Sequence, residues 1–297
     1  MMAHAERFNS RASPGMTHSP HTQQSCMQYT TQIDGIDIHI EGEGSTNIVM
    51  LHGWPDTYRV WEALVVHLQA HLKPHFRCVR FTQPGFDVNG PRRAYSLEEL
   101  IAFYKKLIEQ TCPGQKVVLM LHDWGCFFGY QFAMRHPELV AKVVGIDVGD
   151  ANSADHLKSL PFKGKLGIVA YQAFLLVAWR VSGWGAVGLG NAMTRWMART
   201  FRCPAEPALI GACMTYPYDI TWTGSHGAYR QSQRVALTCP HFFAYGRRKP
   251  FMFHSQAWAD RVAATPGNEV HAYDTGHWVM HRGAVPFNAD VTAWLLK

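Results

Sequence analysis

The chain has 297 residues, of which 47% are apolar, enough for one large α/β domain or two smaller ones with a buried core. Its net charge is +6, but the basic residues are scattered and form no stripe interleaved with aromatic residues, which argues against a nucleic-acid-binding protein. The seven cysteines include no Cys-x-x-Cys pair. Reduced thiols in a cytoplasmic protein are therefore expected, rather than a disulfide framework or a zinc site.

Residues 1–28 are rich in Ser, His, Gln and Thr and lack the apolar stretch of a secretory signal. They predict a disordered tail, with an organellar presequence as the alternative. A longer apolar stretch, residues 166–189, approaches membrane-spanning length but contains Gln172 and Arg180. We expect a buried or lid helix pair there, and no stable membrane insertion.

From residue 29 the sequence alternates strands and helices in the order typical of a mostly parallel, doubly wound sheet. The expected strands are 28–33, 36–41, 47–51, 77–81, 117–120, 140–147, 239–246 and 269–273, and the expected helices are 58–71, 96–111, 127–136, 255–264 and 286–297. Residues 151–233 are helix-like and aromatic, with no strand alternation. This pattern predicts an α/β core in two halves, 29–150 and 234–297, separated by an inserted helical cap, 151–233.

Asp123 is the most informative residue, because it stands between an apolar strand and a helix in the run Leu121-His122-Asp123-Trp124-Gly125. A sharp turn in this context exposes one side chain above the carboxyl edge of the sheet. A carboxylate is already ionised at neutral pH, so it can attack an alkyl carbon without a base and form a covalent alkyl ester. The alternative is that Asp123 only caps the following helix.

Two further segments fit a nucleophile at this position. His277, in Gly276-His277-Trp278, follows the last strand, where a general base for hydrolysing the ester is expected. The backbone amides of Trp54, in His52-Gly53-Trp54-Pro55, and of Trp124 are candidates for the oxyanion hole.

In this order and spacing, the motifs around Trp54, Asp123 and His277 resemble the epoxide hydrolase and haloalkane dehalogenase branch of the α/β-hydrolase superfamily. The resemblance covers roughly residues 29–297 and is greatest to the epoxide hydrolases. It implies an α/β-hydrolase fold, an aspartate nucleophile, and catalysis with no cofactor and no metal.

The acid that orients His277 departs from the common pattern. Many relatives carry it at the position of Lys249, before Pro250. Some haloalkane dehalogenases instead place the acid at the end of the strand after the nucleophile's helix, and Asp147 stands there. Asp150 is the second choice, and the alternative for Asp147 is a strand-end acid satisfied by nearby amides.

Epoxide hydrolases use two tyrosines of the cap to assist the leaving alkoxide. Tyr171 and Tyr218 are the first candidates, followed by Tyr216 and Tyr229. The resemblance therefore implies that a hydrophobic epoxide is converted to a vicinal diol.

Two alternatives remain open. A haloalkane dehalogenase would use the same nucleophile on an alkyl halide and would need side-chain donors for the halide. Trp124 offers one such donor, but Trp54 stands where an asparagine commonly supplies the second. The other alternative is a non-catalytic homologue that only binds a ligand.

Overall fold

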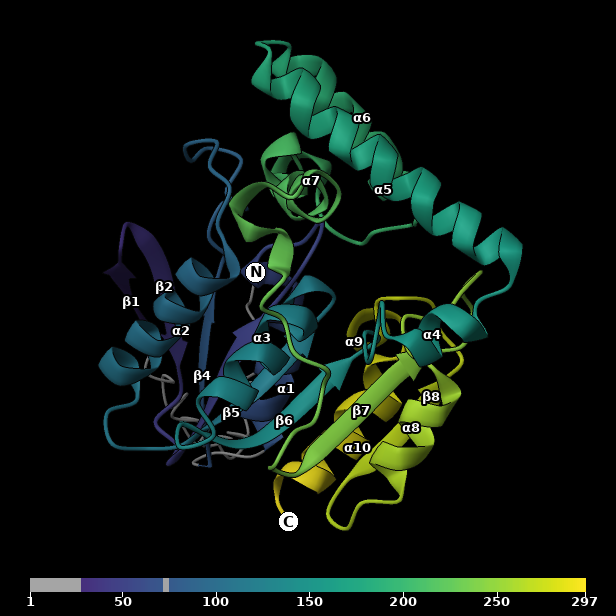
Figure 1. Ribbon diagram of the computed structural model, residues 1–297. Helices are drawn as coiled ribbons and strands as arrows, with labels where there is room; N and C mark the ends of the chain where they lie inside the picture. The colour runs from purple at the N-terminus through teal and green to yellow at the C-terminus, as the bar shows by residue number, and fades with distance from the viewer. Residues whose placement is uncertain (1–27, 72–74) are drawn as a thin grey trace, which may run out of the picture.

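The computed structural model describes residues 28–71 and 75–297 (Figure 1). The predictions for the tail, residues 1–27, lie outside the described residues. Eight strands form one sheet in the order β1-β2-β4-β3-β5-β6-β7-β8. The first hairpin is antiparallel to its neighbours, and the pairs from β4 to β8 are parallel. The predicted mostly parallel sheet is confirmed. The strands are β1 (Gln28–Ile33), β2 (Ile36–Glu41), β3 (Thr46–Leu51), β4 (Phe76–Phe81), β5 (Val117–His122), β6 (Val140–Ile146), β7 (His241–Gly246) and β8 (Glu269–Tyr273).

Helices cover both faces of the sheet, which explains why the central strands are apolar along their whole length. One face packs against α2 (Leu97–Thr111), α3 (Trp124–Arg135) and α8 (Gln256–Ala263), and the other against α1 (Glu62–His71), α9 (Val279–Arg282) and α10 (Ala284–Leu295). A capping box is present at the start of α2, where Ser96 and Glu99 satisfy each other's backbone amides.

Several predicted boundaries were off by a few residues. The helix expected from 127 begins at Trp124, directly after the elbow, and the helix expected from 58 opens as a 3-10 turn, Tyr58–Trp61. The short helix α9 was not predicted. The boundary errors lie at element ends, where local signals are weakest, and α9 is a single turn of four residues.

The chain leaves the sheet after β6 and returns to it at β7. The intervening segment contains α4 (Ala154–Ser159), α5 (Phe162–Gly183), α6 (Val187–Thr200) and α7 (Tyr216–Thr223), with short 3-10 turns between and after them, and no strand forms within residues 151–233. In Figure 1 the long helices α5 and α6 lie side by side above the edge at which the parallel strands end, and α7 lies beneath them. The stretch expected to form a helix pair thus forms α5 and α6, joined at Trp184–Ala186.

Candidate active site

Asp123 occupies a strained turn between β5 and α3. Its φ is 55° and its ψ is −124°, a backbone conformation that costs a residue with a side chain about 1–3 kcal/mol. The side chain makes no capping hydrogen bond to α3, which argues against the simple cap. The turn also needs Gly125, since a Cβ there would lie 2.1 Å from the carbonyl oxygen of Leu51. The backbone therefore presents the Asp123 carboxylate to the cap side of the sheet.

Two backbone amides stabilise the charge of this carboxylate. The Trp54 amide donates to Asp123 Oδ1 at 2.7 Å, and the Trp124 amide contributes to the lowered pKa of the carboxyl. Gly53 makes the close approach possible, because a Cβ there would lie 2.3 Å from both Asp123 Oδ1 and the Trp124 nitrogen. The two residues predicted for the oxyanion hole are thus both at the nucleophile.

His277 lies beside the other carboxylate oxygen. Its Nε2 is 3.3 Å from Asp123 Oδ2, and its Nδ1 hydrogen-bonds Asp147 Oδ2. The imidazole is held between the rings of His122 and Phe253, with centroid distances of 4.5 Å and 5.7 Å. The structure therefore brings together the three residues predicted as nucleophile, base and orienting acid.

Asp147 is fully buried at the end of β6, and its φ of 72° is also positive. It accepts a hydrogen bond from the Gly246 amide at 3.0 Å and forms an ion pair with Lys249. Lys249 thus occupies the position of the usual acid and contacts the acid that replaces it. The sequence analysis noted Lys249 only because no acid stands at that position. The ion pair could have been predicted, because the sequence has a lysine at one of the two positions known for the orienting acid and an aspartate at the other.

These contacts determine the charge state of the site. Burial raises the pKa of Asp147, but Lys249 and then His277 more than offset it and hold that pKa below its usual range. Burial lowers the pKa of His277, yet Asp147 and Asp123 outweigh it and raise that pKa to about 9. Burial likewise opposes ionisation of Asp123, but His277 lowers its pKa below the usual range. In the resting protein at neutral pH, two carboxylates therefore flank a protonated His277.

Asp56 and His122 form a buried pair next to His277. The sequence analysis gave neither residue a role in the site. Asp56 accepts a hydrogen bond from Trp278 Nε1 at 2.9 Å, and its Oδ2 lies 3.7 Å from His122 Nδ1. Burial raises the pKa of Asp56 to about 7, and burial together with the charge of His277 lowers that of His122 to about 3. His122 is therefore neutral. The only feature of the sequence that pointed to His122 was its position directly before Asp123.

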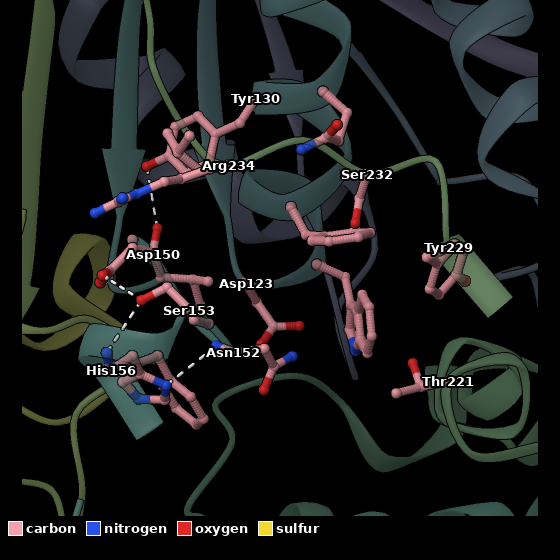
Figure 2. A pocket seen from close by; sticks show the side chains of 18 of the residues that line it. Asp123, Tyr130, Asp150, Asn152, Ser153, His156, Thr221, Tyr229, Ser232 and Arg234 are labelled. Carbon is pink, nitrogen blue, oxygen red and sulfur yellow. Dashed lines mark hydrogen bonds between the residues drawn. The ribbon is translucent and has the colours of Figure 1, made fainter. Parts of the chain in front are cut away.

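Two cavities, of about 500 and 640 Å³, meet at Asp123. Asp123, Tyr171, Tyr218 and Phe253 line both of them. Figure 2 shows the first cavity, with Asp123 at its centre between the Ser153 side and the Tyr229 side. His277 and Trp54 line the second cavity. A small molecule in either cavity can therefore reach the carboxylate.

The four candidate tyrosines separate into two groups. Tyr171 on α5 and Tyr218 on α7 lie with their ring centroids 5.9 Å apart at Asp123, and the Trp124 ring packs edge-on against that of Tyr218, with centroids 5.4 Å apart. Tyr229 lines the first cavity, and its buried hydroxyl has no partner within residues 28–71 and 75–297. Tyr216 lines neither cavity and donates to the carbonyl of Pro84 at 3.1 Å. Its hydroxyl is thus bonded within the core and does not face either cavity.

Asp150 does not reach His277. Its carboxylate accepts hydrogen bonds from the Ser255 amide at 2.6 Å, the Ser255 hydroxyl at 2.8 Å and the Ser153 hydroxyl at 2.6 Å. It ties the start of the cap to the start of α8, so the second choice for the orienting acid is wrong. Throughout the described part of the chain, no group of three or more His, Cys, Asp or Glu side chains is placed to hold a metal ion.

Comparisons with known proteins agree with this geometry. The family model of the alpha/beta hydrolase fold matches residues 46–172. The "Probable oxidoreductase EphD" of Mycobacterium tuberculosis is 28% identical over 151 residues, 49% of this chain, and the match spans only 24% of that relative's length. The "Cis-3-alkyl-4-alkyloxetan-2-one decarboxylase" of Xanthomonas campestris is 24% identical over 85% of this chain and 91% of its own length.

Among solved structures, the epoxide hydrolase of Bacillus megaterium in complex with an inhibitor matches with a TM-score of 0.63 and 18% identity, over 91% of this chain and 100% of its own. The chain is thus a protein of the α/β-hydrolase fold. Within that fold it resembles the epoxide hydrolases, which predominate among its solved neighbours, and the resemblance predicted from the three motifs is confirmed.

Proposed function

We propose that the protein is an epoxide hydrolase that converts a hydrophobic epoxide to a vicinal diol through a covalent ester on Asp123. The observation that carries this proposal is the position of His277, bonded to Asp147 through Nδ1 and 3.3 Å from Asp123 Oδ2 through Nε2. An ionised nucleophile needs no base for its own attack. A base held at its side therefore favours a second step, in which water cleaves an ester.

In the first step, Asp123 Oδ2 attacks a ring carbon of the epoxide and the carbon–oxygen bond breaks. The leaving alkoxide is strongly basic and needs a donor. Burial raises the pKa of both Tyr171 and Tyr218, so both hydroxyls are protonated at neutral pH and can donate. Meanwhile the Trp54 amide fixes Oδ1, which leaves Oδ2 as the attacking oxygen.

Ester formation also prepares the second step. It removes the charge of Asp123, one of the two carboxylates that raise the pKa of His277, so that pKa falls and His277 releases its proton. This proton balances the one that the alkoxide gains. Neutral His277 then deprotonates a water molecule, which attacks the ester carbonyl carbon. The amides of Trp54 and Trp124 stabilise the oxyanion at Oδ1, and its collapse expels the diol.

A second candidate substrate is a four-membered lactone ring. It is favoured by the near full-length match to the oxetan-2-one decarboxylase, because the other curated match described above aligns with only part of this chain. Attack of Asp123 on the saturated ring carbon that is bonded to the ring oxygen would break that bond and leave a carboxylate on the opened ring. Loss of carbon dioxide would then form an alkene and release the Asp123 carboxylate. No water is consumed in that sequence, which separates it from ester hydrolysis.

An alkyl halide is a third possible electrophile. Trp54 Nε1 is buried and has no hydrogen-bond partner among the described residues, so it is free to donate to a halide. The Trp124 ring packs edge-on against that of Tyr218, with centroids 5.4 Å apart. Since Tyr171 and Tyr218 lie together at Asp123 as donors for an alkoxide, and a halide leaving group needs no proton, we rank this reaction below epoxide opening.

A single turnover in heavy-oxygen water, with enzyme in excess, tests the proposal. The three electrophiles are an aryl or long-chain alkyl epoxide, a 1-bromoalkane and a cis-3,4-dialkyl oxetan-2-one. We expect an unlabelled diol from the epoxide and one heavy oxygen in the peptide that contains Asp123. Asp123→Ala should turn over none of the three compounds.

The other outcomes are equally specific. A labelled diol with an unlabelled Asp123 peptide would refute the ester mechanism. Halide release without diol formation would assign a dehalogenase, and alkene with carbon dioxide and no label would assign the lactone reaction. No conversion of any electrophile, with ligand binding retained by Asp123→Ala, would favour a non-catalytic binding protein.

A further inference from the structure

The outer face of α5 carries an apolar stripe that nothing in the structure covers. Its large side chains follow one another at spacings of four, three, eight and seven residues, which places them on one side of the helix. Phe162 and Trp184, near the two ends of α5, are each 80% exposed. The exposed apolar residues of the stripe are Phe162, Leu166, Val169, Val177 and Trp184. We call this set the cap stripe.

The opposite side of α5 faces the protein. Leu175, Ala178 and Ser182 are buried there against α6, α7 and the 3-10 turn Ala212–Thr215. The helix α6 continues the exposed surface with Leu189 and Trp196, whose ring packs 5.2 Å from that of Phe174 on α5. The cap stripe therefore lies on the side of α5 that faces away from the protein, and the buried side of the helix is a different one.

The charge around the cap stripe is of one sign. Between residues 156 and 205 the sequence contains seven Lys or Arg residues and no Asp or Glu. The exposed Lys163 and Lys165 flank Leu166, one on each side of the stripe. A second copy of this surface would be repelled by like charge, whereas an anionic lipid surface would attract it.

Length and composition would allow α5 to cross a membrane, and only 22% of its most apolar window is buried within the protein. Two contacts argue against a spanning orientation. Arg92 donates to the Trp179 carbonyl at 2.9 Å, and Arg180 Nε pairs with Asp219 Oδ1 at 2.5 Å. These contacts tie the inner face of α5 to polar groups of the protein body, which would not enter a bilayer.

We propose that α5 and α6 dock in the plane of an anionic membrane, with the cap stripe in the interface and the flanking lysines at the headgroups. Interfacial helices combine these two features, and their binding scales with buried apolar area and with charge. Peripheral docking leaves the α/β core in water.

The docked orientation would also place the cavities near the lipid. Tyr171 lies on the inner face of α5, across the helix from the cap stripe, and it lines both cavities at Asp123. A helix is about 10 Å across, so an apolar substrate dissolved in the bilayer would have a short path to the nucleophile. This step rests on the proposed function, whereas the docking itself does not.

Vesicle co-sedimentation tests the docking with the 297-residue chain and no substrate. The vesicles are pure phosphatidylcholine, or phosphatidylcholine with about 30% phosphatidylglycerol. We expect binding to the anionic vesicles that falls at high salt. The variant Phe162→Ser/Leu166→Ser/Trp184→Ser should bind at least about tenfold more weakly. Its matched control is Val66→Ser/Val285→Ser, which changes residues 63% and 83% exposed on α1 and α10.

Lys163→Gln/Lys165→Gln separates charge from apolar contact, because it should remove most of the preference for anionic over neutral vesicles. Absence of wild-type binding, or equal binding by the triple variant and its control, would overturn the proposal. So would a concentration-dependent dimer without lipid, seen by sedimentation velocity and lost in the triple variant, since the stripe would then be a self-association surface. Turnover enters none of these readouts, so a failure of the proposed function stays distinguishable.

Discussion

Lys249 and Asp147 form a buried ion pair directly behind the imidazole of His277. Their side chains are 6% and 0% exposed, and the Asp147 carboxylate shares its two oxygens between Lys249 and His277. The ammonium competes with the imidazole for the same negative charge. Lys249 thus lets Asp147 orient His277 while it limits how tightly the proton is held.

Lys249→Met removes that competition. We expect the pKa of His277 to rise, so the pH at which the ester hydrolyses at half its maximal rate should also rise. Decay of the isolated ester intermediate across pH measures this. Arg248→Met, which breaks the exposed pair with Asp274, is the matched control and should leave the profile in place. An unchanged profile in Lys249→Met would mean that the lysine has no influence on the base.

Asp147→Asn should allow the ester to accumulate. His277 would lose its orienting carboxylate, and by analogy with other catalytic triads ester hydrolysis should slow by about 10⁴-fold. Adding Lys249→Asp returns an acid to the position that many relatives use and should recover at least about tenfold of the lost rate. Intact-mass measurement of the ester follows both variants. If the single variant turned over normally, Asp147 would not be the orienting acid.

Tyr171→Phe and Tyr218→Phe should slow ester formation from an epoxide by about 10- to 100-fold each, because the alkoxide loses a donor. Tyr216→Phe is a suitable control, since its hydroxyl bonds the Pro84 carbonyl within the core. It should lower the melting temperature without changing the rate of ester formation. Rapid-quench measurement of that step tests the assignment, and equal effects in all three variants would refute it.

Gly53→Ala should slow ester hydrolysis strongly. The added Cβ would lie 2.3 Å from Asp123 Oδ1 and from the Trp124 nitrogen, so the site of the oxyanion would be filled. A loss of about 10²- to 10³-fold in hydrolysis is expected, the usual effect of losing an oxyanion donor. Gly188→Ala on α6, where a Cβ would meet open space, provides the control. Near-normal hydrolysis in Gly53→Ala would place the oxyanion elsewhere.

Stability should fall between pH 7 and 9. The pKa of His277 is raised from 6.5 to about 9, so its stabilisation is complete below pH 6.5 and is lost as pH rises through 9. The shift corresponds to roughly 3 kcal/mol. Asp56, with its pKa raised to about 7, also lowers stability with rising pH, but only below that value. Urea unfolding of the wild type and of His277→Gln at both pH values measures the effect, and parallel slopes would contradict it.

Periodicity and motif order were sufficient to predict the sheet, the helical segment between β6 and β7, and the sharp turn at Asp123, because each depends on residues close together in sequence. The choice of acid was different. Asp147 and Asp150 lie three residues apart, and only the fold directs the first to His277 and the second to Ser255.

The tyrosines show the same limit. Tyr216 and Tyr218 are neighbours in sequence, yet α7 directs one into the core and the other over the nucleophile. Sequence also places apolar residues on a helix without showing which side stays uncovered. The stretch 166–189 therefore predicted a helix pair, but gave no sign of the cap stripe.

At Asp123 and Asp147, the stability of the backbone and the need for a carboxylate side chain favour different residues. Both residues have a positive φ, which glycine adopts without strain and which is unfavourable for most residues with a side chain. Glycine at these two positions would relax the backbone, and it would also remove both carboxylates that flank His277. A search for stabilising substitutions alone would therefore remove the two negative charges around which the site is built.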